Sequence, residues 1–225
     1  MRSALSKAEI EANIASRFGD AFKIHEKAAP ETLSSGIAEV DSLSGGIPRG
    51  AITEISGPRS SGRTSLLYSA LAYATTHDEI CALIDTNDTF APTSAAAAGI
   101  DFERLLWIRC AANLEHAFKA TDLLLHAGGF GLVILDIGDV AGKEARRIIS
   151  SWWYRFRRTI ENRPTAIIVI SEEACTRSCA ALTLELHGNG EWSRNLLSSN
   201  SVNVNRCRPF WPAFNESQFR AHAVA

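Results

Sequence analysis

Five short apolar runs follow one another through the middle of the chain, and segments with helical spacing separate them. The runs are AITEIS at 51–56, ICALID at 80–85, LLWIRC at 105–110, LVILDI at 132–137 and AIIVIS at 166–171. Near-continuous apolar strands that alternate with helices are typical of a parallel sheet with both faces covered. The pattern therefore predicts a three-layer α/β core around a mostly parallel sheet.

The pattern changes after Ser171, where apolar and polar residues begin to alternate. ALTLEL at 181–186 and SVNVNRCR at 201–208 alternate in this way, and HGNGEW at 187–192 lies between them. Alternation with period two indicates strands with one solvated face, and the glycines indicate a turn. We therefore expect the core to close with an antiparallel hairpin whose turn lies at 187–192.

Helical spacing also marks the start of the chain, before the first apolar run. Leu5, Ile10, Ile14 and Phe18 recur at this spacing, and Gly19 then offers a stop. Residues 26–36 are small and polar, as in a linker. We therefore predict an N-terminal arm helix and linker over residues 1–36 and a single core domain over residues 37–225.

Composition narrows the class of protein. A chain of 225 residues with 46% hydrophobic content can bury one good core. The net charge of −2 gives no global basic field, so contact with nucleic acid would need a local patch. The chain has no apolar run of about 18 residues and no signal peptide pattern, and its five cysteines are odd in number, which suits reduced thiols. These features predict a soluble cytoplasmic protein.

The candidate chemistry begins at residues 57–64, GPRSSGRT, which follow the first apolar run directly and precede a helical segment. They match the phosphate-binding pattern G-x-x-x-x-G-K-[ST], except that Arg63 replaces the lysine. Backbone N–H groups of such a loop cradle phosphates. Arginine is bulkier than lysine and forms different hydrogen bonds, so the replacement is not conservative. The candidate nucleotide-binding residues are Gly57, Pro58, Arg59, Ser60, Ser61, Gly62, Arg63, Thr64, Ser65 and Asp136.

A magnesium site is the second candidate. Asp136 ends the apolar run at 132–137, where a carboxylate can hold the water shell of Mg²⁺, and the Thr64 hydroxyl is the other ligand that the loop pattern supplies. The sequence therefore indicates ATP or ADP with Mg²⁺ at a degenerate site, or otherwise no cofactor.

A basic and aromatic cluster at 143–158 is the third candidate, and we expect it on one helix of about five turns. Its members are Lys143, Arg146, Arg147, Trp152, Trp153, Tyr154, Arg155, Arg157 and Arg158. Aromatic rings beside arginines suit single-stranded nucleic acid. Ile148, Ile149, Trp152 and Phe156 also recur at helical spacing, which favours a buried face with solvated arginines outside. The second interpretation is the stronger one.

Three segments resemble the RecA/RadA recombinase superfamily. SGIAEVDSLSGGIPRGAITEISGPRSSGRTSLL at 35–67 is similar to the opening of its core, CALIDTNDTFAPTSAAAAGIDFERLLWIRC at 81–110 to the following segment, and VNVNRCRPFWPAFNESQFR at 202–220 to its last core strand. The resemblance covers most of residues 5–220. It implies a RecA-like P-loop fold.

Several positions depart from the family pattern. Asn87 stands where the resemblance places the catalytic glutamate, and Glu172 stands where it places the glutamine that senses the γ-phosphate. The two DNA-binding loops that the family carries after Asp136 and after Ser171 are missing. With Arg63, these changes predict a degenerate ATPase with no catalytic residue, leaning away from an enzyme and from strand exchange.

The resemblance also suggests partner-binding residues. Arg206 and Arg208 match a lysine pair that reaches the neighbouring protomer's nucleotide in RecA, although charges also protect an edge strand from aggregation. Phe18 opens a Phe-x-x-Ala sequence, the docking pattern of the wider family.

A RecA-type core with these losses resembles the ImuA-type accessory proteins of bacterial translesion synthesis. This resemblance implies a role in the DNA damage (SOS) response through contacts with an ImuB-type polymerase-like protein, an error-prone polymerase and RecA. DNA contact is then weak or indirect, and no membrane is involved. Two alternatives remain open: an active RecA/RadA-paralogue ATPase of homologous recombination, and a regulator of RecA filaments.

Overall fold

The computed structural model describes residues 31–145, 147–148, 150–193, 196–209 and 216–222, together with Asn13 and Ser16. The chain divides into two compact units, Met1–Pro30 and Glu31–Ala225. Apart from Asn13 and Ser16, which are helical, the predicted arm helix lies outside the described residues, and so does Phe18. Everything that follows concerns the second unit.

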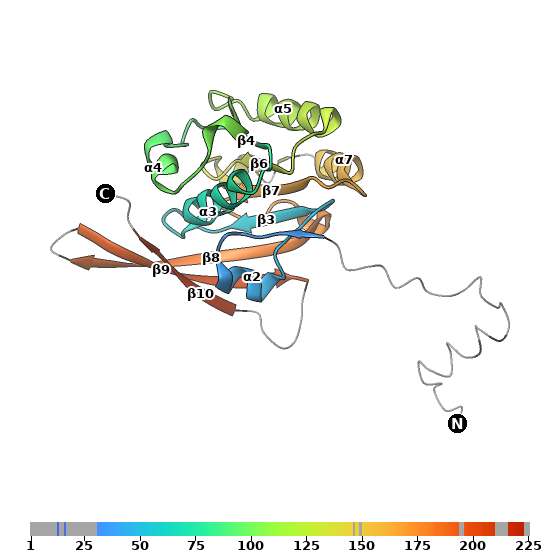
Figure 1. The fold of residues 1–225 in the computed structure, drawn as a ribbon. Coiled ribbons are helices and arrows are strands. Elements are labelled where there is room, and N and C mark those ends of the chain that lie inside the picture. Colours follow the sequence, from blue (N-terminus) through green and yellow to red (C-terminus); the bar gives the residue numbers. More distant parts are fainter. Residues whose placement is uncertain are drawn as a thin grey trace. The chain divides into compact units, whose positions relative to one another are not determined.

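One eight-stranded sheet forms the centre of this unit, in the order β10-β9-β8-β3-β7-β6-β4-β5 (Figure 1). The five predicted apolar runs are confirmed as its parallel strands: β3 (Ile52–Ser56), β4 (Cys81–Asp85), β5 (Leu105–Arg109), β6 (Leu132–Asp136) and β7 (Ala166–Ser171). Strand β8 (Ala180–Ser193) continues the parallel part beside β3. Strands β9 (Leu196–Arg208) and β10 (Glu216–His222) then add in antiparallel orientation.

Helices cover both faces of the sheet, which confirms the three-layer α/β core. Cys81 and Leu83 of β4 join one apolar cluster, whereas the alternate residues Ala82 and Ile84 join the other. Both faces of a central strand are therefore buried, which explains its continuous apolar sequence. The first cluster packs against α2 (Ala38–Ser44), α3 (Arg63–Thr76) and α4 (Pro92–Ala97), and the second packs against α5 (Leu114–Ala127), α6 (Gly142–Ala145) and α7 (Ser150–Ile160).

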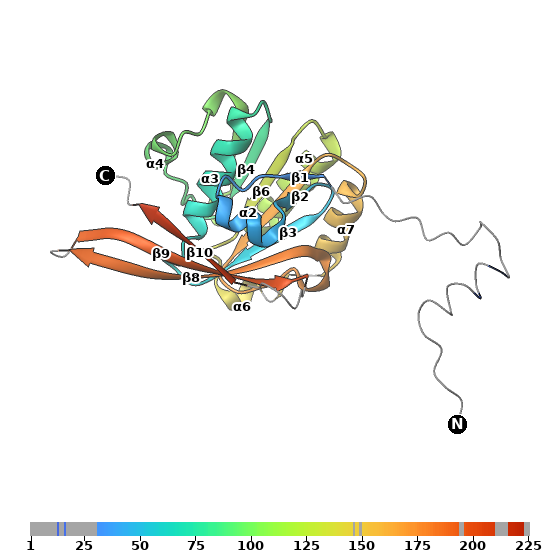
Figure 2. The ribbon, with the colours of Figure 1, turned by 60° about the horizontal axis from the view of Figure 1, so that its bottom comes forward.

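The final hairpin is longer than predicted, and the predicted turn position is wrong. Strand β8 continues through residues 187–192 to Ser193, and β9 begins at Leu196 (Figure 2). Gly188 pairs with Val202 within the ladder, and a Cβ at Gly188 would lie 2.2 Å from the carbonyl oxygen of Ser60. This glycine therefore serves a close approach to the phosphate loop, not a turn.

The core begins earlier than residue 37. Strand β1 (Thr32–Leu33) pairs with β2 (Ile47–Pro48) in a small antiparallel sheet, and Leu33 is buried. Residues 31–36 therefore belong to the compact unit and not to the predicted linker, because the side chain of Leu33 packs in the core.

The single helix expected over 143–158 is also wrong, because it is divided into α6 and α7. The Arg147 and Ile148 N–H groups donate to the carbonyl oxygens of Glu144 and Ala145, three residues back and not four, so the α-helical ladder ends between the two helices. Ala145 of α6 and Trp153 of α7 are both buried. Phe156 is buried as expected, while Arg155, Arg157 and Arg158 are exposed, which agrees with the solvated-arginine interpretation.

Short 3₁₀ helices η2 (Phe102–Arg104) and η3 (Arg177–Cys179) complete the described elements. Within the part of the chain that the structure describes, no helix has the length and apolar character needed to cross a membrane.

Candidate functional site

The phosphate loop leaves β3 at the carboxyl edge of the parallel strands and leads into α3. The Gly57 N–H donates to the carbonyl oxygens of Ser171 and Glu172 at 3.3 and 3.2 Å. Ser60 and Gly62 adopt φ values of +63° and +95°, so the chain turns sharply before α3 begins. The N–H groups at the start of this 14-residue helix have no partner further back in the helix, which suits them to an anion.

The β8–β9 hairpin supports this loop from outside. Asn200 donates from Nδ2 to the carbonyl oxygen of Ser60 at 3.0 Å. A Cβ at Gly62 would lie 2.5 Å from Val202 Cγ2, and one at Gly57 would lie 2.4 Å from the carbonyl oxygen of Leu186. The loop is therefore held in its wound shape by neighbouring strands, without requiring a ligand.

Arg63 is buried at the start of α3, with 8% of its surface exposed. Its Nη1 donates to the carbonyl oxygen of Gly138, in the turn after β6, at 3.0 Å. Burial lowers the pKa of Arg63, and the charges of Asp136, Asp139 and Glu172 oppose this shift. An arginine remains protonated under such conditions, so the buried group is a cation.

Asp136 ends β6 beside this guanidinium. Its Oδ1 accepts a hydrogen bond from the Gly138 N–H at 2.8 Å. Burial raises the pKa of Asp136 to about 6, against the opposing effects of that hydrogen bond and of Arg63. A second bridge, from Arg59 Nε to Asp139 Oδ1 at 3.1 Å, also joins the phosphate loop to the turn after β6. Arg63 thus lies near Asp136 at the end of β6, and Arg59 pairs with Asp139 in the turn that follows.

These groups enclose a cavity of about 60 Å³. Small-molecule sites commonly measure about 300–1,000 Å³, so a nucleotide would have to lie outside this enclosed space, over the loop. The lining residues are Arg63, Thr64, Leu67, Tyr68, Leu83, Thr89, Phe90, Asp136, Gly138, Asp139 and Ile170. The structure therefore brings Thr64, Asp136 and Arg63 together, as expected from the sequence. Ser65 lies apart from them and lines a groove toward α2 and β10.

The arrangement does not fit a hydrated Mg²⁺ in addition to Arg63. A Cβ placed on Gly138 would lie 2.8 Å from Arg63 Nη1 and 3.0 Å from Asp136 Oδ1, so these two charged atoms are close neighbours. A divalent cation held by Asp136 would meet the arginine charge at short range, where repulsion is strong.

The segment after β4 holds no general base at the expected position. Asn87 stands there, and its buried Oδ1 accepts no hydrogen bond from the described residues. Asp85 accepts from the N–H groups of Thr89 and Phe90, each at 3.0 Å, and from Trp107 Nε1 at 3.2 Å. That carboxylate is thus fully engaged in holding the segment.

The carboxylate of Asp88 is turned toward β5, where both of its oxygens accept hydrogen bonds from Arg109 at 3.1 Å. Glu172, at the expected sensor position, is exposed.

Glu54, in the middle of β3, is a residue of this region that the sequence did not single out. It is 1% exposed, and its carboxylate accepts hydrogen bonds from Cys175 N at 2.6 Å, Thr176 N at 3.0 Å and Thr176 Oγ1 at 2.6 Å. It therefore fixes the short connection between β7 and β8. The available signal was a glutamate inside an otherwise apolar central strand, since buried charge is rare unless it is paired or hydrogen-bonded.

Arg206 and Arg208 are half-buried and bind their own chain. Arg206 Nη1 donates to the carbonyl oxygen of Leu43, and Arg208 Nη1 donates to that of Arg177 at 2.6 Å. Their contact with a partner stays a prediction.

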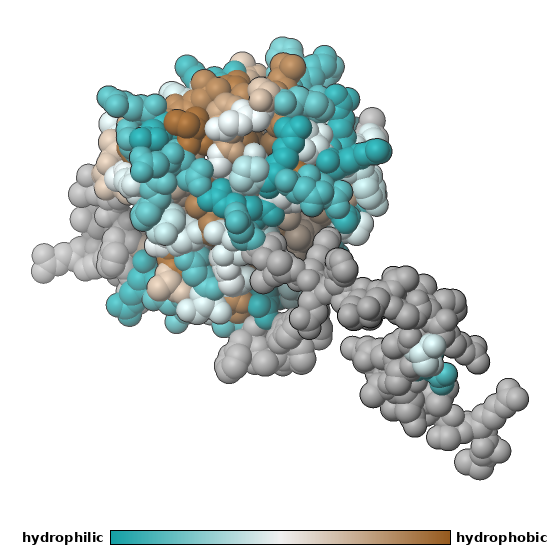
Figure 3. Space-filling model, turned by 45° about the vertical axis from the view of Figure 1, so that its right-hand side comes forward, coloured by the Kyte–Doolittle hydropathy of each residue, from teal (hydrophilic) through white to brown (hydrophobic). Residues whose placement is uncertain are grey.

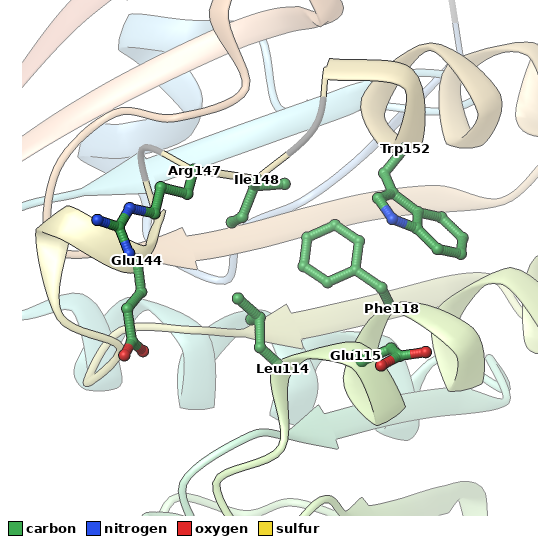
Figure 4. Close-up of a pocket in the computed structure, with 7 residues that line it drawn as sticks. All are labelled: Leu114, Glu115, Phe118, Glu144, Arg147, Ile148 and Trp152. Atoms are coloured by element: carbon green, nitrogen blue, oxygen red, sulfur yellow. The ribbon is translucent and has the colours of Figure 1, made fainter.

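A second, more apolar cavity of about 390 Å³ lies between α5 and the α6–α7 segment (Figure 4). Its lining residues are Leu114, Glu115, Phe118, Glu144, Arg147, Ile148 and Trp152. Phe118 and Trp152 form one wall, with ring centroids 5.7 Å apart, and Glu144 and Arg147 lie at the other end. Figure 3 shows apolar surface at the top of the unit, toward α5, bordered by hydrophilic side chains.

The wound glycine loop between a central parallel strand and a helix defines this chain as a P-loop α/β protein. The family described as RecA N-terminal domain matches residues 5–149, and the chain belongs to this family. Protein RecA of Nostoc punctiforme is 37% identical over 121 residues, which cover 53% of this chain and 32% of that relative. Protein RecA of Wigglesworthia glossinidia brevipalpis is 32% identical over 160 residues, or 63% and 47% of the two chains.

The matched region thus spans about a third to a half of these relatives' length. The crystal structure of the RadB recombinase superposes with a TM-score of 0.65 and 20% identity, covering 84% of this chain and 96% of that one. This likeness shows a shared RecA-like fold.

Proposed function

We propose that this RecA-family protein is an ImuA-type accessory factor, which supports error-prone translesion synthesis in the DNA damage response through protein–protein contacts. In this function the phosphate loop is a degenerate, non-hydrolysing site. The partners are an ImuB-type polymerase-like protein, an error-prone polymerase and RecA.

The observation that carries the proposal is the buried hydrogen bond from Arg63 to Gly138. A lysine at this position in an active loop reaches the β- and γ-phosphates. Arg63 instead binds a carbonyl oxygen of its own chain, beside the carboxylate that would serve the metal.

Two further observations support the loss of hydrolysis. Asn87 carries an amide where a carboxylate base is needed, and the neighbouring Asp85 and Asp88 are both engaged in other hydrogen bonds. The connection between β7 and β8 consists of residues 172–179, which Glu54 holds in place, so no long DNA-binding loop follows β7.

The direct test is affinity purification of the tagged protein from bacterial cells after DNA damage, followed by mass spectrometry. We expect the ImuB-type protein or an error-prone polymerase subunit to be enriched over a tag-only control, with or without RecA. Recovery of neither would contradict the proposal. Recovery of RecA without the ImuB-type protein would instead favour a regulator of RecA filaments.

The enzyme alternative, a DNA-dependent ATPase of homologous recombination, predicts phosphate release that single-stranded DNA stimulates. We expect the wild-type protein to release no more phosphate than the Asp136→Ala variant under these conditions. Stimulated turnover above this control would overturn the non-hydrolysing assignment and establish the alternative.

A further inference from the structure

The phosphate loop and the turn after β6 meet through opposite charges. Arg59 reaches Asp139 at 3.1 Å, and Arg63 lies buried beside Asp136. We infer that Arg63 takes the place of the divalent cation, so that the loop binds nucleoside di- and triphosphates independently of Mg²⁺. This inference rests on the degenerate site of the proposed function and specifies its ligand.

The geometry is the first reason. The guanidinium is anchored by its bond to the Gly138 carbonyl oxygen at 3.0 Å. A side chain at position 138 would displace it, since a Cβ there would lie 2.8 Å from Arg63 Nη1. The turn after β6 thus has the one residue type that leaves room for the cation in the neighbourhood of Asp136. A lysine ammonium is a compact point charge without this planar fork, so it would not fill the same space.

The charge balance is the second reason. An Mg²⁺ ion binds where carboxylates and phosphate oxygens together supply negative charge. Here each of the two nearby carboxylates, Asp136 and Asp139, already faces an arginine. A metal would have to lie beside a buried cation to reach Asp136, and the charge of that cation already offsets part of the negative charge there.

The capacity for an anion is the third reason. Within the described residues, the main-chain N–H groups of Ser60 and Gly62 have no acceptor. They lie in a loop whose shape is fixed by Asn200 and Val202. With the start of α3 and the two arginines, they supply donors and positive charge for phosphate oxygens.

The test is calorimetric titration of the full chain with ADP, and with a non-hydrolysable ATP analogue, in excess MgCl₂ and in excess EDTA. We expect wild-type binding to be no tighter in excess MgCl₂ than in EDTA, because Mg²⁺ that complexes the nucleotide in solution finds no ligand set in the site. In the Arg63→Lys variant, Mg²⁺ should tighten binding by about tenfold or more. Lys119→Arg, which keeps the charge at an exposed position on α5 away from the loop, should behave as the wild type.

Three results would overturn the inference: tenfold tighter wild-type binding with Mg²⁺, no wild-type binding in either condition, or an Arg63→Lys variant without Mg²⁺ dependence. If Arg63→Lys fails to fold by circular dichroism, Mn²⁺ in the wild-type ADP mixture decides. Electron paramagnetic resonance should then show no protein-bound Mn²⁺ beyond the Mn²⁺–ADP complex of a protein-free mixture, and additional protein-bound Mn²⁺ would overturn the inference. Partner capture does not depend on these titrations, so the proposed function can fail or stand separately.

Discussion

Asn200 on β9 donates a hydrogen bond to the carbonyl oxygen of Ser60 at 3.0 Å and so ties the final hairpin to the phosphate loop. The two residues are 140 positions apart in the sequence. The shape of this loop, near the start of the core sequence, therefore depends on a strand near its end.

The Asn200→Ala variant should lose this support. We expect the free energy of unfolding to fall by about 1 kcal/mol, the usual net value of one hydrogen bond. Hydrogen exchange at Ser60–Gly62 should also become faster. Urea unfolding and exchange mass spectrometry measure these two effects. Asn189→Ala, an exposed position on the same hairpin, is the matched control and should stay within about 0.5 kcal/mol of wild type. Equal behaviour of the two variants would contradict the proposed support.

Gly62→Ala should destabilise the loop for two separable reasons. The residue has φ +95°, and its new Cβ would lie 2.5 Å from Val202 Cγ2. We expect a loss of about 2–3 kcal/mol from backbone strain and overpacking together. In a double-mutant cycle with Val202→Ala, the double variant should be about 1 kcal/mol more stable than the sum of the single effects. Strict additivity would show that the hairpin does not constrain this glycine.

Glu54→Gln should weaken the connection between β7 and β8. The glutamine keeps the size of the side chain but loses the charge that strengthens three hydrogen bonds from Cys175 and Thr176. We expect the free energy of unfolding to fall by about 2 kcal/mol, measured in urea at neutral pH. Glu185→Gln, exposed on β8, should change it by less than about 0.5 kcal/mol. A neutral effect at Glu54 would argue against its positioning role.

Thiol labelling should single out Cys207. All five cysteines are free, and the four others, Cys81, Cys110, Cys175 and Cys179, are buried. Burial raises the pKa of Cys81 to about 12, which leaves almost no thiolate at neutral pH. Partial burial and the nearby Glu185 also raise the pKa of Cys207, so its labelling should be slow at pH 8 and faster as the pH rises.

Ellman's reagent should therefore detect one thiol in the native protein and five after denaturation. Cys207→Ser should abolish the native signal. Rapid native labelling of a second cysteine would mean that a buried thiol is accessible.

The parallel strands could be predicted from the sequence because a strand buried on both faces needs a continuous apolar run, and β4 and β6 are such runs. The phosphate loop could be predicted because its glycine spacing is local, and so could the replacement of its lysine by Arg63. The predicted turn was misplaced because a glycine such as Gly188 is typical of a turn. Here the glycine is needed because the backbone of Ser60 lies too close to leave room for a side chain.

The sequence by itself determined where the parallel strands and the phosphate loop lie along the chain, and which residues of the site are altered. Only the tertiary structure decided what those residues do. Arg63 meets Gly138 across 75 positions, and Glu54 meets Thr176 across 122. No local pattern encodes such pairs, because the sheet brings strand ends together regardless of their separation in sequence. The charge of Arg63 was visible from the start, but the carbonyl that it binds was not.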